Sequence, residues 1–144
     1  MKAHNQVTLE FPSRSANESF ARTATACFAA QLDPTLEEIN DIKTAVSEAV
    51  TNAIVHAYPD DIGTIWLKAR ILEGDKLEIV VKDKGRGIAD LKQAMEPLFT
   101  TGGEDRSGMG FTIMESFTDH LKVRSAPGKG TTVTMVRRIR RRRG

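Results

Sequence analysis

The sequence predicts a two-layer α+β sandwich in which helices cover one face of a mixed, mostly antiparallel sheet. Segments with the period of a strand and segments with the period of a helix occur together, without a regular strand-helix-strand alternation. The chain has 144 residues, of which 40% are hydrophobic and 28% charged, which suits one core and is too short for two. We therefore expect a single domain, and we do not expect a parallel nucleotide-binding fold.

The first part of the chain predicts one strand and two helices. Residues 6–11 alternate between polar and apolar side chains, as a half-buried strand does. Ser15 with Glu18, and Thr35 with Glu38, have the spacing of capping boxes, which begin helices. Apolar residues then recur at helical spacing, so we expect a first helix up to Asp33-Pro34 and a longer second one up to Tyr58-Pro59.

The second part predicts two hairpins on either side of a glycine-rich segment. Apolar and β-branched residues dominate residues 64–72 and 77–82, which a turn-prone stretch joins. Residues 83–110 are rich in glycine and charge, with a short helical piece around Asp90 to Met95, and long loops of this kind are often lids or binding loops. A third helix over 110–117 and a closing hairpin of residues 121–125 and 131–136 complete the expected fold.

The net charge of +2 does not describe the body of the chain, because it depends on a cluster of arginines at the end. Six arginines lie within residues 137–144, and removing them from the 21 basic residues leaves 15 against 19 acidic ones, a net charge of −4. A run of like charges is typically a solvated tail, so we expect a domain over residues 1–136 and a disordered basic tail over 137–144. Because the body is acidic, we expect no direct contact with nucleic acid.

The sequence contains no segment typical of a membrane helix or a secretory signal. No stretch approaches the ~18 consecutive apolar residues that a membrane helix needs, and the N-terminus lacks a basic start followed by an apolar core. The single cysteine, Cys27, cannot form an internal disulfide, and we expect it to be a small buried apolar residue. These features predict a soluble, cytoplasmic protein that has no membrane partner.

The second predicted helix carries a polar stripe beside its apolar one. Glu48, Asn52 and His56 are spaced four residues apart, which places them on one side of an α-helix. A carboxylate can act as a general base, and a side-chain amide oxygen is a hard ligand suited to Mg²⁺. From the spacing alone, Glu48 and Asn52 could equally face solvent, and we expect His56 to serve packing.

Glycine turns provide a second group of candidate site residues. Asp83 ends a predicted strand and leads into Gly85 and Gly87; its carboxylate can accept a hydrogen bond from an adenine amino group, although any hairpin can end in this way. Two segments lead towards the third helix, whose N-terminal amides suit a phosphate chain. These segments are Thr100-Thr101-Gly102-Gly103 and Arg106-Ser107-Gly108-Met109-Gly110, which by themselves could also mark only a mobile loop. The chain has neither a P-loop nor a Gly-x-Gly-x-x-Gly motif.

Four motifs in this order resemble the N, G1, G2 and G3 boxes of the GHKL ATPases, which share the Bergerat ATP-binding fold. They are Glu48-x-x-x-Asn52, Asp83-x-Gly85-x-Gly87, Gly108-x-Gly110 and Gly130-Thr131. Residues 15–22, 31–35, 47–53, 97–101 and 106–115 also resemble the family of sporulation anti-sigma F factors, and the resemblance covers nearly the whole chain apart from the arginine tail. In that family a dimeric protein sequesters a sporulation sigma factor and uses ATP to phosphorylate a serine on an anti-anti-sigma factor.

The resemblance implies a role for each residue of the site. Glu48 would be the general base on the serine hydroxyl, Asn52 would hold Mg²⁺, and Arg106 would neutralise charge at the γ-phosphate. Asp83 would bind adenine, with Thr131 nearby. The remaining contacts to ATP or ADP would come from Gly85, Gly87, Thr100, Thr101, Ser107, Gly108, Met109 and Gly110.

The resemblance also implies the partners of the protein. These are a sporulation sigma factor, an anti-anti-sigma factor as the serine substrate, and a second copy of the chain in a homodimer. Glu18 and Arg22 would face the partners, although capping and surface charge explain these two residues equally well. A kinase of the general stress response, a non-catalytic ATP-binding adaptor and a tail that anchors nucleic acid stay open as alternatives.

Overall fold

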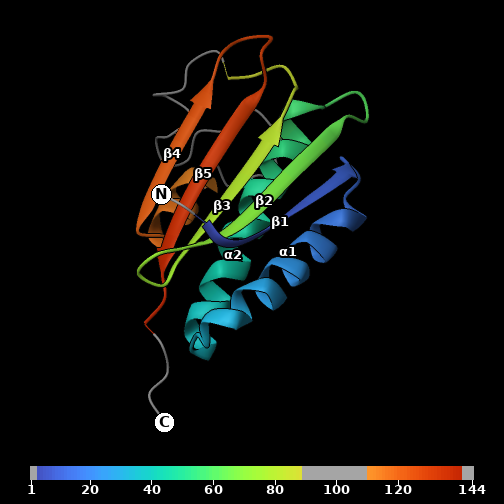
Figure 1. Ribbon diagram of the computed structural model, residues 1–144. Helices are drawn as coiled ribbons and strands as arrows, with labels where there is room; N and C mark the ends of the chain where they lie inside the picture. Colours follow the sequence, from blue (N-terminus) through green and yellow to red (C-terminus); the bar gives the residue numbers. More distant parts are fainter. Residues whose placement is uncertain (1–2, 89–109, 141–144) are drawn as a thin grey trace.

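The computed structural model describes residues 3–88 and 110–140 of the chain, and these form a sheet covered on one face by helices (Figure 1). The strands are β1 (Ala3–Pro12), β2 (Thr64–Leu72), β3 (Lys76–Asp83), β4 (His120–Ser125) and β5 (Thr131–Arg138). Helix α1 (Ala16–Ala29) is followed by a 3₁₀ turn, η1 (Ala30–Leu32). Helix α2 (Leu36–Asn52) continues as a π-helical turn, η2 (Ala53–Ala57). The last described helix is α4 (Gly110–Ser116). The predicted α+β sandwich is confirmed.

The sheet has five strands in the order β1-β2-β3-β5-β4. All four pairings between the described strands are antiparallel, whereas the sequence left room for a mixed sheet. The turn between β2 and β3 has a positive φ at Gly74 and Asp75, which fits the turn-prone residues found there. The predicted helical piece around Asp90 to Met95 lies outside the described residues.

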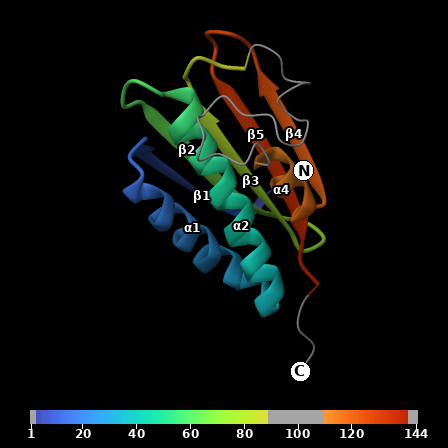
Figure 2. The same ribbon diagram turned by 180° about the vertical axis from the view of Figure 1, so that it is seen from behind.

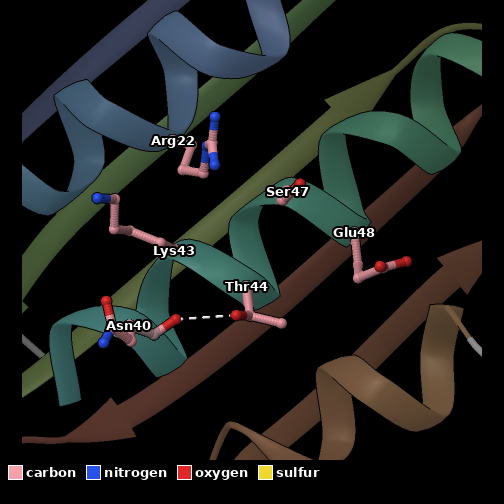
Figure 3. A pocket seen from close by; sticks show the side chains of 6 residues that line it. All are labelled: Arg22, Asn40, Lys43, Thr44, Ser47 and Glu48. Atoms are coloured by element: carbon pink, nitrogen blue, oxygen red, sulfur yellow. Dashed lines mark hydrogen bonds between the residues drawn. The ribbon is translucent and has the colours of Figure 1, made fainter. Parts of the chain in front are cut away.

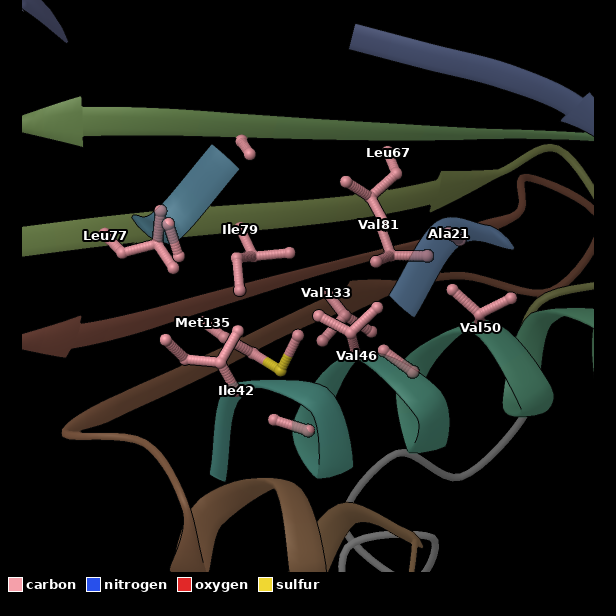
Figure 4. Close-up of a cluster of buried hydrophobic side chains, with 14 of the residues drawn as sticks. Ala21, Ile42, Val46, Val50, Leu67, Leu77, Ile79, Val81, Val133 and Met135 are labelled. Atoms are coloured by element: carbon pink, nitrogen blue, oxygen red, sulfur yellow. The ribbon is translucent and has the colours of Figure 1, made fainter. Parts of the chain in front are cut away.

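The helices form one layer, in which α2 lies between α1 and α4 (Figure 2). Alternate residues of the strands point towards this layer, because successive side chains of a strand face opposite sides of the sheet. Ile42, Val46 and Val50 line one side of α2 at helical spacing and are at most 1% exposed. Figure 4 shows these three side chains against the strand residues that complete the core, among them Leu77, Ile79, Val81, Val133 and Met135.

The beginning of α2 is joined to the end of the chain by one buried carboxylate. The predicted capping box is present: Glu38 accepts a hydrogen bond from the Thr35 backbone N–H at 2.9 Å, and its own N–H donates to Thr35 Oγ1 at 3.1 Å. The second oxygen, Oε2, accepts from the Arg140 backbone N–H at 2.7 Å. Burial by itself would raise the pKa of Glu38, but the hydrogen bonds from Arg140 and Thr35 outweigh it and lower the pKa.

The capping box predicted at the start of α1 does not form. Ser15 has helical backbone angles, φ −57° and ψ −31°, and its side chain makes no capping hydrogen bond. An N-cap needs an extended backbone for its oxygen to reach the free amides, so Ser15 cannot serve as one. Glu18 instead pairs with Arg22 one turn later, at 3.2 Å.

Two further predictions from the sequence are corrected. The boundary expected at residue 136 is too early, because β5 continues to Arg138 and Ile139 is only 2% exposed in the core. Arg137 also pairs with Asp41 at 3.0 Å, so the first arginines belong to the domain; of the predicted tail, residues 141–144 lie outside the described part. Cys27 is exposed, since α1 turns that side chain away from the core, and it is not the buried apolar residue that was expected.

Replacing Glu38 by alanine should lower the free energy of unfolding by about 2 kcal/mol, because it leaves the amides of Thr35 and Arg140 without their acceptor. In a thermal melt this corresponds to a decrease of roughly 8 °C. The matched control is Glu37→Ala, which removes an exposed acid from the same first turn. Since the pKa of Glu38 is lowered, its contribution is present at neutral pH and is lost as the pH falls through that pKa. Equal melting temperatures for the two variants at pH 7 would contradict this account.

Candidate functional site

A buried aspartate lies at the end of β3, where the strand enters the glycine turn. Asp83 is 5% exposed, and its Oδ1 accepts hydrogen bonds from the backbone N–H groups of Gly85 at 2.9 Å and Thr131 at 3.2 Å. Burial raises the pKa of the Asp83 carboxyl, and the two N–H donors oppose this rise only in part. A buried acceptor of this kind suits a ligand that brings a hydrogen-bond donor.

A serine that the sequence analysis did not single out extends this cluster. Ser125, at the end of β4, lies opposite Thr131 in the sheet, and their hydroxyl oxygens are 2.8 Å apart. Ser125 Oγ also accepts from the Ile88 backbone N–H at 2.8 Å. Because Thr131 lies opposite Asp83 in turn, three neighbouring strands meet at this corner. The predicted closing hairpin already contained the signal, since its two strands end and begin at Ser125 and Thr131.

Two glycines at this corner are required by close backbone approach. Gly130 has φ +79°, and a Cβ on it would lie 2.2 Å from the carbonyl oxygen of Asp83. Gly87 has φ +75°, and a Cβ there would lie 2.0 Å from the carbonyl oxygen of Ala126. Both values are far below any real contact distance, so no other residue fits without moving the backbone.

The end of the α2 helix is fixed to the turn that follows Asp83. The Ala57 carbonyl, in the π-helical turn η2, accepts a hydrogen bond from the Arg86 N–H at 3.1 Å. A Cβ on Gly85 would lie 2.3 Å from the same carbonyl. The hydroxyl of Tyr58 accepts from the Lys84 N–H at 2.8 Å and donates to the Thr64 carbonyl at 2.8 Å. These hydrogen bonds join the end of the helix to the glycine turn.

The predicted polar stripe holds for two of its three members. Glu48 and Asn52 lie one turn apart on α2, and both are half-buried. His56 follows in the π-helical turn η2, and its expected place in the stripe stays a prediction. The Asn52 side chain packs against Gly110 at the start of α4, where a Cβ would lie 3.0 Å from Nδ2. The structure thus brings Asn52 and Gly110 together.

A cavity of about 320 Å³ lies on the outer face of α2 and reaches Glu48 (Figure 3). Arg22 extends into it from α1, and Lys43 and Ser47 lie on the side of α2 towards α1. Glu48 lies on the side towards α4. Of the two residues expected to face partners, Arg22 therefore lines this cavity, while Glu18 holds Arg22 by the ion pair at 3.2 Å.

Part of the predicted phosphate site cannot be placed. Thr100, Thr101, Arg106, Ser107, Gly108 and Met109 lie outside the described residues. Gly110 is the described member of that motif, and it begins α4 as expected.

The donor set of the described residues suits a magnesium ion that a nucleotide brings with it. Residues 3–88 and 110–140 contain no group of three or more His, Cys, Asp or Glu side chains that could hold a metal by themselves. Mg²⁺ keeps several waters and is often bound by one or two protein oxygens together with phosphates. The half-buried amide of Asn52, next to the start of a helix, is a ligand of this kind.

Among the residues described, no helix is both long enough and apolar enough to cross a bilayer.

The fold and the glycine turns around Asp83 define an ATP-binding domain of the histidine kinase-like class. The model of the histidine kinase-like ATPase domain family matches residues 11–137. Curated relatives are called anti-sigma F factor. The relative from Caldanaerobacter subterraneus subsp. tengcongensis is 59% identical, and the match covers 99% of this chain and the whole of the relative. The relative from Clostridium novyi is 52% identical, and the match covers 94% of this chain and 96% of the relative. The chain therefore belongs to the GHKL ATPase family and, within it, to the family of anti-sigma F factors.

Solved structures agree with the fold at low sequence identity. The RsbU and RsbW domains of Rv1364c from Mycobacterium tuberculosis match 94% of this chain with a TM-score of 0.70 and 20% identity, and this chain spans 32% of theirs. The mycobacterial sensor histidine kinase MprB matches 93% of this chain and its own whole length, with a TM-score of 0.58 and 16% identity. At such identities the two comparisons support the architecture alone.

Two alanine substitutions in the β4-β5 turn separate the cost of a positive φ from the cost of a steric clash between the new Cβ and the backbone. Gly130→Ala and Gly128→Ala share nearly the same backbone strain, with φ +79° and +75°, but a Cβ at Gly128 meets nothing within 4 Å. We expect Gly128→Ala to cost about 1 kcal/mol of unfolding free energy. Gly130→Ala should cost at least about 3 kcal/mol, because it must also push β5 away from the Asp83 backbone. Chemical denaturation measures both, and equal losses would contradict the close approach.

Replacing Asp83 by asparagine should leave the ligand-free protein at least as stable at pH 7. The amide oxygen can accept the same N–H groups, while the cost of burying a charge disappears. Because the pKa of Asp83 is raised, its ionisation destabilises the fold as the pH rises through that pKa, so the advantage of Asp83→Asn should vanish in acid. Thermal melts from pH 3 to 8 test this. A variant that is less stable at pH 7 would show that the charge itself holds the corner together.

Proposed function

We propose that this protein is an ATP-dependent protein-serine kinase that phosphorylates an anti-anti-sigma factor and also binds and inhibits a sporulation sigma factor. The observation that carries the proposal is the placement of Glu48 and Asn52 on one helix whose end is bonded to the glycine turn after Asp83. The relatives named anti-sigma F factor, which match the chain almost from end to end, support the choice of partners.

In the proposed site, adenine lies at the corner formed by Asp83, Thr131 and Ser125. The Asp83 carboxylate would accept a hydrogen bond from the adenine amino group, and the glycine turn at Gly85 and Gly87 leaves space for the ring. The phosphates would extend towards the start of α4 at Gly110, beside Asn52. Thr100, Thr101 and residues 106–109 remain proposed phosphate contacts on the evidence of their motifs.

Glu48 would act as the general base in the transfer. The serine oxygen forms a bond to the γ-phosphorus while the bond from that phosphorus to the bridging oxygen breaks. The hydroxyl proton passes to the Glu48 carboxylate, and ADP leaves. Asn52 would hold Mg²⁺ together with the phosphates, the bound ion would supply positive charge to the oxygens that become more negative, and Arg106 would add to it. Glu48 is half-buried, lines the cavity on α2 and is therefore open to a partner protein.

The proposed partners need a surface on α1 and a second copy of the chain. Arg22 lines the cavity next to Glu48, which supports a role for Glu18 and Arg22 in partner binding. β1 is an edge strand of ten residues in the described sheet, and its Val7 is 37% exposed. An exposed edge strand of this length supports the proposed homodimer. We further propose that the protein acts in the cytoplasm.

A second candidate is a kinase of the general stress response. Its fold would be the same, and the structural similarity to the RsbU and RsbW domains of Rv1364c, at 20% identity, concerns that fold only. Capture of sigma factors by the purified protein separates the two candidates, because recovery of a stress sigma factor alone would reject the sporulation partner.

Replacing Glu48 by glutamine should abolish transfer while nucleotide binding is kept. Without the base, we expect the rate of serine phosphorylation to fall at least about 100-fold, with the affinity for ATP changed by no more than about twofold. Transfer of label from γ-labelled ATP to the purified anti-anti-sigma factor measures the rate, and Glu115→Gln, an exposed acid on α4, is the matched control. Undiminished transfer by Glu48→Gln would reject this base. Nucleotide binding without any transfer by the wild-type protein would favour the non-catalytic adaptor.

A further inference from the structure

The cavity on α2 is a polar groove that leads along the helix to the proposed base. Asn40, Thr44 and Glu48 are spaced four residues apart and form one row, which continues to Asn52. With a rise of ~1.5 Å per residue, this row is about 18 Å long from Asn40 to Asn52. Figure 3 shows Arg22 and Lys43 on the side of α2 towards α1, and Glu48, the last of the row to line the groove, on the side towards α4.

The two cationic side chains of the groove, Arg22 and Lys43, differ in whether they already have a partner. Arg22 is already engaged, since its Nε lies 3.2 Å from Glu18 and its Nη2 donates to Ser19 Oγ at 3.3 Å. Lys43 takes part in none of the three ion pairs found within residues 3–88 and 110–140. Asp41, two residues before it, is held by Arg137 at 3.0 Å. Lys43 is thus the cation of the groove that is best placed to take a carboxylate from outside.

The hydrogen-bonding groups suit an extended peptide segment. The Thr44 hydroxyl donates to the Asn40 carbonyl at 2.9 Å, so its oxygen offers only lone pairs to the groove. It can therefore accept from the backbone N–H of a partner. Ser47 and the Asn40 side chain can each donate or accept, which matches the alternating donors and acceptors of an extended chain.

We propose that this groove binds the segment of the substrate protein that carries the phosphoacceptor serine, and that Lys43 pairs with an acidic side chain of that segment. The inference rests on the proposed kinase function, and it adds a specificity-determining residue outside the nucleotide site. Lys43 and Glu48 are five residues apart, or about 7.5 Å along the helix axis. The two side chains also lie on different sides of α2 (Figure 3), and an extended chain advances ~3.3 Å per residue, so the acidic residue lies about three to five positions from the serine that meets Glu48.

Charge reversal tests the proposal on the complete protein. Label transfer from γ-labelled ATP to the cognate anti-anti-sigma factor is measured for the wild type, for Lys43→Glu and for Lys68→Glu, which reverses an exposed lysine on strand β2. We expect Lys43→Glu to raise the KM for the partner protein about tenfold, with the KM for ATP and kcat nearly unchanged. Lys68→Glu should leave all three constants as they are. Reversing the acidic residue of the partner to lysine should restore the KM of Lys43→Glu.

Each outcome separates this inference from the function on which it rests. If the wild type labels no serine, the proposed kinase function fails and the inference fails with it. If transfer proceeds but Lys43→Glu keeps the wild-type KM, the inference alone is rejected. A raised KM that no charge reversal within about five residues of the serine restores would also reject the pairing with an acidic side chain. Thermal melts of both variants check that the fold is intact.

Discussion

The carboxylate of Asp83 receives the backbone N–H groups of Gly85 and Thr131 at a point where it is 5% exposed. This buried acceptor joins the end of β3 to the beginning of β5 and to the glycine turn, and the hydroxyl pair of Thr131 and Ser125 extends the connection to β4. Three strand ends are thereby held in one corner. Burial raises the pKa of this carboxyl group, and keeping its charge there is a cost that a purely structural corner does not need.

The position of α2 depends on the same corner. Its last turn widens into a π-helix, and this places the Ala57 carbonyl against Gly85 and in hydrogen-bond contact with Arg86. At the other end, Glu38 ties the helix to Arg140. Because both ends are fixed and one side is packed on the sheet, Glu48 and Asn52 are held at a defined distance from Asp83. Catalysis of phosphoryl transfer is mostly positioning and electrostatics, so this rigidity is what the proposed function requires.

Periodicity was sufficient to predict the strands, the helices and the α+β class, because each element has one apolar face. The box motifs located Asp83, Asn52 and Gly110, which the structure places at one end of the domain. Other features could not be predicted, since they depend on contacts distant in sequence. In the sequence, residues 137–140 look like part of a basic tail, and only the structure shows that Ile139 packs in the core. The π-helical turn at the end of α2 could not be read from periodicity, and Ser15 fits a capping pattern that its backbone angles exclude.

Discrimination between adenine and guanine tests the central claim, that Asp83 forms the base-binding corner of a nucleotide site. A carboxylate at this position accepts a hydrogen bond from the adenine amino group but repels the carbonyl oxygen that guanine carries in its place. Titration calorimetry of the wild-type chain with ATP and with GTP, both with Mg²⁺, measures this directly. The account predicts that ATP binds at least about 100-fold more tightly than GTP. Equal binding of the two nucleotides, or binding of neither, would contradict it.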